Sequence, residues 1–552
     1  MGGSTATSRR EPHSDHSRFK ALPPYAENQH VNILSLELHL REHPDRSAVN
    51  FILEGLRSGF RIGFRGQLSD TSRPNNKSAL ENSRIVTNAV QKEVAREHTA
   101  GPFLSPPFPI NHISPLGAVP KKDGTCRIVF DLSQPEGESI NDFIFKEEYP
   151  CSYTHFDEAT ELTLLMGRGC FLSKIDIKHA YRLLPVHPRD WPLLVYRWQE
   201  HFYVDLKLPF GCRSSASIFT AFADLVCWIL RHHYRLTVIH YSDDFLIVTG
   251  PDRALAQKHQ DTFKEVFWRL WIPCADDKTV GPSTKLPFLG ISISTTDFTL
   301  SIPEKKVNDI LQELPRWCAR KTCTKRELES LHGRLNFFSK VIVPGRLFVR
   351  RLIELSTTVR HRNHHITMNK QAREDIHWWC EFLHSWNRSS YIPETKWIHS
   401  TDLLLFTDAA KGFGLGAVYK SAWIQSGWDD TRAAMSIDYL ELFAIFAAII
   451  TWGYQWRGKR IVMITDNESI TQIWAKGSSS KPELMTLVRR IFMFAAANSF
   501  TVSFKHIPGK TNKAADALSR FQMQRFRQLM PGADVNPTKI PANVWDVNVH
   551  LH

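Results

Sequence analysis

The sequence VIHYSDDFLIV, residues 238–248, places the tetrapeptide YSDD between two runs of apolar residues. The two runs are typical of strands, and the polar segment predicts a tight turn with Asp243 and Asp244 at the tip of a hairpin. Two adjacent carboxylates repel one another and present the oxygen ligands that a hard cation such as Mg²⁺ requires. An acidic hairpin turn that binds no metal is an equally good interpretation of this stretch taken alone.

Asp176, in the stretch CFLSKIDIKHAYRLLPV, is a second candidate metal ligand. It lies at the end of a strand-like run, between Ile175 and Ile177. An acidic side chain among buried aliphatic residues needs a partner or a metal. Asp176 and Asp243 could together hold two Mg²⁺ ions for phosphoryl transfer, one activating a primer 3′-hydroxyl and the other steadying pyrophosphate.

The order of several motifs around YSDD adds a family resemblance. The motif is preceded by DIKHAY and LPFGCRSSASIF and followed by LPFLGI, and this series resembles that of reverse transcriptases. The resemblance implies that Asp176, Asp243 and Asp244 are the catalytic carboxylates, with Asp244 the less direct ligand. It also implies that Tyr181 blocks a ribose 2′-hydroxyl and so selects deoxynucleotides, with an ordinary core tyrosine as the alternative. Lys278 resembles a later lysine of the family or is a surface charge.

A basic segment upstream, PKKDGTCRIVFDLS, resembles the fingers hairpin of the same family. The resemblance implies that Arg127 grips the incoming triphosphate in a forked geometry, while Lys121 or Lys122 acts as a point charge. A solvated basic turn is the alternative. Phe210 and Gly211, in LPFGCRSSASIF, fall where the family lines its nucleotide pocket.

A second group of carboxylates lies nearer the C-terminus. Asp408 follows an apolar run in LLLFTDAAKGFGLGAVY, whose glycines are best interpreted as hairpin glycines because a strand follows them. Glu441 lies in the apolar helix YLELFAIFAAII, Asp466 follows the strand RIVMIT, and Asp516 lies in KAADALSR. If these side chains cluster, mutual repulsion requires two divalent cations. Independent capping is a reasonable alternative for Asp516 and a weak one for Glu441.

The segments that carry these carboxylates resemble ribonuclease H. They are DAAKGFG, LELFA, TDNES and HIPGKTNKAADALSR, and the last is close to that of long-terminal-repeat and related retrotransposons. The resemblance implies that the four carboxylates bind two metals and that water attacks an RNA phosphate. It further implies that His506 assists proton transfer or product release, with a structural histidine as the alternative. Asn512 would support the loop.

Composition agrees with a polyanionic partner. Lys and Arg number 69 against 56 Asp and Glu, which gives a net charge of +13 and favours nucleic acid. The nine Cys include no CxxC pair, which favours a reducing compartment. The N-terminus lacks the apolar run of a secretion signal, and the apolar stretch Leu442 to Tyr454 is too short for a membrane span. We therefore expect an intracellular protein without a membrane partner, in the cytoplasm or the nucleus.

The pattern of strands and helices predicts an α+β right-hand polymerase, with fingers, palm and thumb, followed by an α/β ribonuclease H-like domain. The expected segments are a partly disordered N-terminal extension (1–95), fingers and palm (96–300), a helical thumb and connection (301–400), the ribonuclease H domain (401–521) and a C-terminal tail (522–552).

Together the two resemblances predict an RNA-directed DNA polymerase with ribonuclease H activity. Its expected cofactor is Mg²⁺, two ions per active site, with Mn²⁺ as a substitute, and its expected partners are an RNA template, a DNA primer, the RNA–DNA hybrid and deoxynucleoside triphosphates. One alternative is a catalytically decayed or domesticated nucleic-acid-binding protein, which the intact carboxylates disfavour because they repel phosphates. Another is a chain in which ribonuclease H alone is active.

The parent element is expected to be a retrotransposon. FDLSQPEGESIND, the upstream GFRIGFRG and the short link to the ribonuclease H segment resemble DIRS-like elements most, with gypsy-like elements next. The sequence contains no Asp-Ser-Gly or Asp-Thr-Gly of an aspartic protease and no paired His and Cys of a zinc-binding integrase head. We therefore expect integration to depend on a recombinase or integrase encoded elsewhere in the element.

Overall fold

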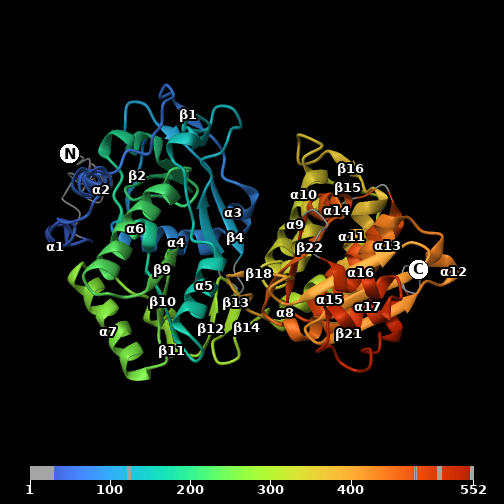
Figure 1. Ribbon diagram of the computed structural model, residues 1–552. Helices are drawn as coiled ribbons and strands as arrows, with labels where there is room; N and C mark the ends of the chain where they lie inside the picture. Colours follow the sequence, from blue (N-terminus) through green and yellow to red (C-terminus); the bar gives the residue numbers. More distant parts are fainter. Residues whose placement is uncertain (1–29, 121–125, 478, 480, 507–511, 547–552) are drawn as a thin grey trace, which may run out of the picture. The chain divides into compact units, whose positions relative to one another are not determined.

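A computed structural model describes residues 30–120, 126–477, 479, 481–506 and 512–546 of the chain (Figure 1). The chain forms two compact units. The first consists of Met1–His155 and Phe171–Ser283, and the second of Phe156–Cys170 and Thr284–His552. These limits differ from the sequence-based segments, because the second unit begins near residue 284 rather than 301 and also takes in residues 156–170.

The first unit is built on a four-stranded antiparallel sheet in the order β11–β6–β10–β9. Helices α6 and α7 pack against β9 and β10, and Phe245 of β10 contacts the rings of Phe263 and Phe267 at 5.5 Å. The apolar run of β10 is typical of a strand buried on both faces, and five of its six residues are buried. These elements are β6 (Phe171–Asp176), β9 (Val238–Tyr241), β10 (Asp244–Thr249), β11 (Val280–Ser283), α6 (Ser215–His232) and α7 (Arg253–Arg269).

A five-stranded sheet in the order β1–β3–β7–β8–β2 and a separate hairpin, β4–β5, complete the sheets of this unit. Their strands are β1 (Thr71–Ser72), β2 (Thr99–Phe103), β3 (His112–Ile113), β4 (Leu116–Pro120), β5 (Cys126–Phe130), β7 (Val195–Trp198) and β8 (His201–Asp205). Short 3-10 helices connect them: η2 (Ile140–Phe143), η3 (Lys146–Glu148), η4 (Ala180–Leu183), η5 (Pro188–Leu193) and η6 (Asp276–Lys278).

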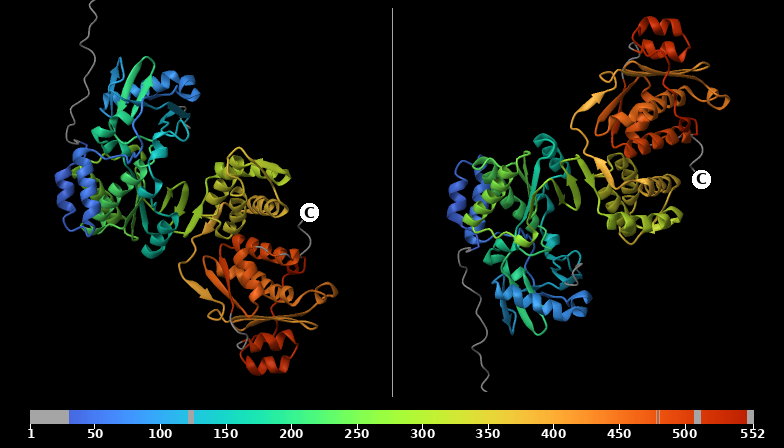
Figure 2. Two further views of the ribbon diagram at one scale, coloured as in Figure 1. Left: turned by 90° about the horizontal axis from the view of Figure 1, so that it is seen from above. Right: turned by 90° about the horizontal axis from the view of Figure 1, so that it is seen from below.

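Four helices near the N-terminus belong to the same apolar core as these sheets. Leu36, Ile52, Leu56 and Val86 are fully buried in it. Figure 2 shows α1 and α2, in blue, beside the green helices of the unit, and α2 contacts α6. The region expected to be a partly disordered extension is therefore packed from residue 31 onward, while residues 1–29 lie outside the described residues. The helices are α1 (Ile33–His39), α2 (Arg46–Ser58), α3 (Lys77–Glu81) and α4 (Ser83–Ala95).

The first half of the second unit is a small antiparallel sheet in the order β12–β13–β14–β17, followed by helices. The mostly helical character expected from residue 301 agrees with α8 to α11. The elements are α5 (Phe156–Met166), β12 (Lys285–Phe288), β13 (Ile291–Ser294), β14 (Thr299–Ser301), α8 (Glu304–Ala319), β15 (Thr322–Thr324), α9 (Lys325–Phe338), η7 (Val343–Gly345), α10 (Arg346–Ser356), β16 (His365–Thr367), α11 (Lys370–Ser385) and β17 (Ser389–Tyr391).

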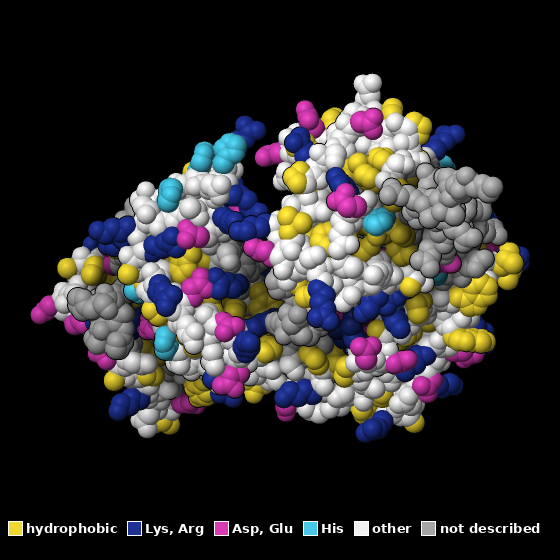
Figure 3. Space-filling view, turned by 180° about the vertical axis from the view of Figure 1, so that it is seen from behind, with side chains coloured by type: hydrophobic (Ala, Val, Ile, Leu, Met, Phe, Trp, Pro, Cys, Tyr) yellow, Lys and Arg dark blue, Asp and Glu magenta, His cyan; other side chains and the backbone are white. Residues whose placement is uncertain are grey.

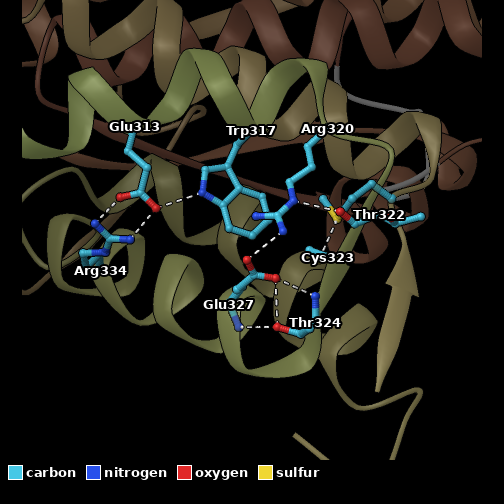
Figure 4. A network of polar contacts seen from close by, with 9 residues as sticks. Glu313, Trp317, Arg320, Thr322, Cys323, Thr324, Glu327 and Arg334 are labelled. Carbon is cyan, nitrogen blue, oxygen red and sulfur yellow. Dashed lines mark hydrogen bonds and ion pairs between the residues drawn. The ribbon is translucent and has the colours of Figure 1, made fainter. Parts of the chain in front are cut away.

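A polar network fixes α8 against the start of α9 (Figure 4). The Thr324 side chain caps α9 by accepting a hydrogen bond from the Glu327 N–H. The Glu327 carboxylate accepts a hydrogen bond from the Thr324 N–H at 2.8 Å, which completes a capping box. Arg320 donates to Glu327 at 2.7 Å, and Arg334 of α9 forms an ion pair with Glu313 of α8. Loss of such a cap costs about 1 kcal/mol, so this turn is well defined.

The second half of this unit has the strand and helix order expected for residues 401–520. An antiparallel hairpin sheet, β19–β20–β21, stands beside a parallel sheet, β18–β22–β23. The elements are β18 (Trp397–His399), β19 (Leu405–Ala410), β20 (Gly414–Tyr419), β21 (Ala422–Gly427), α12 (Asp430–Ala433), α13 (Ile437–Trp452), η8 (Gly453–Trp456), β22 (Arg460–Thr465), α14 (Glu468–Lys476), α15 (Pro482–Ala497), β23 (Thr501–His506) and α16 (Lys513–Ser519).

Helix α13 is the central helix of this region. Together with η8 it is, by length and composition, the one helix among the described residues that is apolar enough to cross a membrane. However, 72% of its apolar window is buried inside the protein, and it packs against β19, β20 and α15. This is the environment of a core helix.

The C-terminal residues up to 546 pack onto the same region. Helix α17 (Met523–Leu529) brings the Phe526 ring to 5.4 Å from Trp423, and the Trp423 indole donates to the Asp534 carbonyl at 2.8 Å. After η9 (Ala542–Val544), the Trp545 carbonyl accepts a hydrogen bond from Arg432 at 2.7 Å. The segment expected to be a tail is therefore folded in its described part.

Candidate active sites

Strand pairing brings the first carboxylate set together. Asp176 ends β6, Asp244 begins β10, and the two are direct partners in the antiparallel ladder. Opposed residues of such a ladder project from the same face, with Cβ atoms about 5 Å apart. Asp243 lies in the preceding turn, where its carbonyl accepts a hydrogen bond from the Ile177 N–H at 3.1 Å. All three predicted carboxylates therefore meet at one end of the sheet.

The turn that carries Asp243 is tight and strained. Tyr241 and Asp244 are paired residues, so only Ser242 and Asp243 form the loop. Ser242 has a φ of 54°, in the left-handed region. A residue other than glycine adopts this conformation at a cost of about 1–2 kcal/mol, and such strain is concentrated at functional sites.

Two lysines balance the charge of these carboxylates. Burial raises the pKa of Asp176, and the charges of Asp243 and Asp244 raise it further, against the ion pair of Asp176 with Lys278 at 3.0 Å. Burial and the neighbouring Asp244 also raise the pKa of Asp243. The Lys174 ammonium lies 3.0 Å from Asp244 Oδ1. The three carboxylates at this end of the sheet therefore repel one another strongly, and cations relieve this repulsion.

The residues expected to line the nucleotide pocket lie beside this turn. The Tyr181 ring is 4.9 Å from that of Phe210, and the Ser242 side chain acts on its hydroxyl group. Burial raises the pKa of Tyr181, so this hydroxyl stays protonated. The exposed Arg127 of the β4–β5 hairpin has its guanidinium 5.8 Å from the Phe210 ring. Lys121 and Lys122 lie outside the described residues.

Gly211 is required by a close backbone approach. Its φ is 109°, and a Cβ atom there would lie 2.3 Å from the Phe130 carbonyl oxygen. Asn141 holds the same loop, because its side chain donates to the Gly211 carbonyl and accepts from the Arg213 N–H, both at 2.8 Å. We did not predict a role for Asn141, since a single asparagine in a loop carries no pattern from which its partners could be recognised.

The second carboxylate set surrounds a small cavity. Asp408 of β19, Glu441 of α13 and Asp466 after β22 line a cavity of about 50 Å³, together with Asn512. Burial raises the pKa of Glu441 to about 7, and the charges of Asp466 and Asp408 contribute to the rise. The pKa of Asp408 is raised by burial as well. Three carboxylates from three separate elements thus converge on one point.

Asp516 stands next to this cavity rather than in its lining. Its charge raises the pKa of Asp408, and Ser519 of the same helix donates to Asp408 Oδ2 at 2.5 Å. The two Asp516 oxygens are bound by Arg520 at 2.7 Å and by Arg525 at 3.1 Å. Asp516 therefore adjoins the set, but two guanidinium groups hold its carboxylate.

His506 lies at the edge of the second site. It ends β23 with an exposed side chain, and its ring nitrogen Nε2 is 3.1 Å from the Asp466 carbonyl oxygen. Its expected part in proton transfer or product release stays a prediction. Asn512 binds the Thr407 carbonyl through its side chain, which fits the expected support of the loop.

Known protein families match both regions. Residues 119–293 match the model of a family described as "Reverse transcriptase (RNA-dependent DNA polymerase)". Residues 426–522 match a second family, described as "Reverse transcriptase-like". The chain contains a reverse transcriptase domain. The domain that follows it is ribonuclease H-like, as expected.

Similar proteins include retrotransposon polyproteins. The chain is 22% identical to the Transposon Tf2-3 and Tf2-7 polyproteins of Schizosaccharomyces pombe (strain 972 / ATCC 24843) over 429 residues, which is 74% of this chain. It spans 29% of the length of these relatives. Among solved structures, it is similar to a foamy viral protease-reverse transcriptase in complex with double-stranded DNA, with a TM-score of 0.46 and 16% identity, covering 88% of this chain and 84% of that one.

Small residues let the ribonuclease H-like domain bring Asp516 close to Asp408. Gly416 of β20, the direct partner of Asp408, lies under α16. A Cβ atom on Gly416 would lie 2.5 Å from Leu518 Cβ and 2.6 Å from the Ala515 carbonyl oxygen. Among the glycines of the segment KGFGLG, this one is needed for the approach of a helix that carries a site residue.

The donors of both sites suit a divalent cation. Asp244 Oδ1 is buried beside the Lys174 ammonium, and within the described part of the chain Glu441 Oε2 is a buried oxygen atom with no hydrogen-bond partner. Carboxylate oxygens are the ligands that Mg²⁺ prefers. Still, no three His, Cys, Asp or Glu side chains of the described residues are placed so that they could hold a metal ion. Metal binding by these sets would therefore involve movement of their side chains and of the lysines and arginines that contact them.

Proposed function

We propose that the chain is an RNA-directed DNA polymerase with ribonuclease H activity, which copies retroelement RNA into DNA and removes the RNA of the hybrid. The observation that carries this proposal is the presence of two separate carboxylate sets in the two matched domains. One is fixed by the pairing of Asp176 with Asp244, and the other surrounds the cavity of Asp408, Glu441 and Asp466. A protein that only binds nucleic acid has no need of either set, because carboxylates repel phosphates.

In the polymerase site, Asp176, Asp243 and Asp244 would hold two Mg²⁺ ions, for which Mn²⁺ could substitute. Bound there, the cations would supply charge stabilisation for phosphoryl transfer. Tyr181 and Phe210 would form the side of the pocket that receives the sugar, and Gly211 would allow the backbone to approach it. Arg127 and the lysines 121 and 122 would bind the triphosphate.

In the ribonuclease H site, Asp408, Glu441 and Asp466 would hold the cations, with Asp516 as a fourth ligand once Arg520 and Arg525 release it. His506 would exchange protons at the open edge of this site. The expected nucleic-acid partners follow from the net charge of +13, and Lys and Arg side chains gather in several groups on the face shown in Figure 3.

The proposal includes the type of retrotransposon that encodes this chain. The motifs around residues 59–66 and 130–142 favour a DIRS-like retrotransposon, whereas the similarity to Tf2 polyproteins favours a gypsy-like one. We propose an intracellular location, and a recombinase or integrase of the element as the partner for integration.

One experiment tests both activities. The parent, Asp243→Asn and Asp466→Asn are supplied with an RNA template, a DNA primer, deoxynucleotides and Mg²⁺, and both primer extension and RNA cleavage are measured. We expect Asp243→Asn to lose extension by at least about a hundredfold and to keep cleavage, since it removes a metal ligand from one site only. Asp466→Asn should show the reverse.

The matched controls are Asp261→Asn on α7 and Asp430→Asn on α12, which change exposed aspartates of the same two domains. Both should behave as the parent. Extension that survives Asp243→Asn would disprove the polymerase assignment, and cleavage that survives Asp466→Asn would disprove the ribonuclease assignment. A parent that binds the hybrid but does neither reaction would support the decayed nucleic-acid-binding protein.

A further inference from the structure

Arg182 follows Tyr181 directly, and both belong to the short 3-10 helix η4. Such a helix has three residues per turn, so consecutive side chains point about 120° apart. Tyr181 packs between the rings of Phe210 and Phe219, at 4.9 and 5.2 Å. Arg182 extends instead toward α4 and β8, away from the nucleotide pocket. A shift in the backbone of this short turn therefore moves both side chains.

Arg182 is the centre of a buried ion cluster. Its guanidinium binds Asp205 Oδ1 of β8 at 2.8 Å and Glu93 Oε2 of α4 at 3.2 Å. The side chain of Arg182 is 14% exposed and that of Asp205 only 3%, so water does little to screen these contacts. Removing one partner from a buried ion pair leaves an uncompensated charge, which the local structure must rearrange to accommodate.

Other groups complete the cluster. Asp205 accepts a hydrogen bond from the Thr99 hydroxyl at 3.1 Å, and a ring nitrogen of His98 lies 3.1 Å from Glu93 Oε2. Arg182 also lies 3.4 Å from the Lys207 carbonyl oxygen, to which it donates. Because the guanidinium is planar and its donors are fixed relative to one another, these acceptors determine its orientation as well as its position.

The backbone of η4 is a short turn with a strained start. The turn begins at His179, whose φ of 56° lies in the left-handed region. Its backbone bonds run from the Arg182 N–H to the His179 carbonyl and from the Leu184 N–H to the Tyr181 carbonyl, at 2.8 and 3.2 Å. A single strained turn is not stable by its own hydrogen bonds, so it depends on its surroundings: Ala180 and Leu183 are buried in the core, and the Arg182 side chain anchors the turn to α4 and β8.

We propose that Arg182, through its ion cluster with Asp205 and Glu93, is a positioning residue that holds Tyr181 in the nucleotide pocket and thereby sets the discrimination between deoxyribonucleotides and ribonucleotides. The inference rests on the proposed polymerase function and on the expected contact of Tyr181 with the sugar. When the cluster is intact, η4 keeps the Tyr181 ring against Phe210. When it is broken, the turn relaxes, the ring withdraws, and the pocket gains room for a 2′-hydroxyl.

The test measures kcat/KM for a ribonucleotide and for the matching deoxynucleotide, and compares their ratio among variants. Arg182→Met keeps the length of the side chain and removes its charge, and Asp205→Asn changes a residue outside the pocket that binds Arg182 directly. We expect both to raise the ribonucleotide-to-deoxynucleotide ratio by roughly tenfold, mainly by lowering KM for the ribonucleotide, because the discrimination rests on steric contact. Arg182→Lys should retain more discrimination than Arg182→Met, since it keeps the positive charge but loses the forked donors of the guanidinium.

The matched control is Asp190→Asn. Asp190 is also buried, with 1% of its side chain exposed, and also pairs with an arginine of the same unit, Arg61, at 2.9 Å. It has no contact with η4 among those that the structure shows, so its loss should lower stability and leave the ratio unchanged. If Asp190→Asn raises the ratio as much as Asp205→Asn, a general loss of stability explains the change in the ratio and the proposal is overturned.

Tyr181→Ala distinguishes a failure of the positioning role from a failure of the proposed polymerase function on which it rests. A parent that fails to extend a primer would disprove the polymerase function, and a Tyr181→Ala variant with an unchanged ratio would disprove the contact with the sugar. If Tyr181→Ala raises the ratio while Asp205→Asn and Arg182→Met keep the parental value, the polymerase function stands and the positioning role is wrong. Thermal unfolding of each variant identifies a misfolded protein, and Asp205→Asn, the mildest change, decides the question if Arg182→Met does not fold.

Discussion

At the scale of single residues, the two sites balance buried negative charge in different ways. Asp176 and Asp244 each lie beside a lysine ammonium, whereas Asp516 is held by two guanidinium groups. Glu441 has no ion pair with a lysine or arginine within the described part of the chain, and its Oε2 atom has no hydrogen-bond partner. The charge of Glu441 should therefore depend strongly on an added cation.

Glu441 should make the stability of the metal-free protein depend on pH. Its pKa is raised to about 7, so its neutral form is favoured in the folded state, and stability is lost as pH rises from about 4.5 through 7. In EDTA, we expect the midpoint of thermal unfolding to fall over this range, on the order of a few degrees. In Glu441→Gln, which cannot ionise, this part of the fall should be absent.

The comparison is made by thermal melts of parent and variant at matched ionic strength between about pH 5 and pH 8. Mg²⁺ should raise the midpoint of the parent more at the upper end of this range, since the carboxylate must be deprotonated to bind it. Identical pH profiles for the two proteins would contradict the assignment.

The sequence predicts that the catalytic candidates are carboxylates able to bind a metal, because a carboxylate beside an apolar run is visible as a pattern. The residues that contact these carboxylates could not be predicted. Lys174 and Asn141 contribute through contacts that only strand pairing and loop folding create. The expected roles of Lys121 and Lys122 remain predictions.

At the scale of elements, the site depends on how closely α16 can approach the strand next to Asp408. The space for this approach is set by Gly416 in β20. The sequence predicted the order of strands and helices here because their hydrophobic periods are regular. It did not predict the packing of α16, since the distance between two elements depends on which small residues face one another.

We expect Gly416→Ala to destabilise the protein by about 1–3 kcal/mol and to lower ribonuclease activity, because overpacking displaces α16 and with it Asp516. Thermal unfolding and cleavage of an RNA–DNA hybrid measure the two effects. Gly427→Ala in the adjacent strand is the matched control, since the nearest atoms to its Cβ would lie 3.8 Å away. Equal effects of the two substitutions would show that the contact under α16 is unimportant.

At the scale of the whole molecule, the excess of positive charge should dominate the affinity for nucleic acid. The net charge of +13 implies that binding of a polyanion releases counterions. We expect the Kd for a labelled RNA–DNA hybrid, measured by fluorescence anisotropy, to rise at least about tenfold between about 50 and 200 mM KCl. A Kd that stays constant over this range would show that phosphate contacts contribute little.

The connection between the two compact units also has a consequence for synthesis of the chain. Helix α5 and the residues after it, 156–170, belong to the second unit, although both neighbouring stretches belong to the first. The chain thus passes between the units three times, and neither unit is one continuous piece of sequence. A ribosome adds about 5–20 residues per second. Residues 156–170 therefore emerge several seconds before the rest of their unit, and Phe156 and Ala159 of α5, which are buried in the folded protein, stay uncovered during this interval.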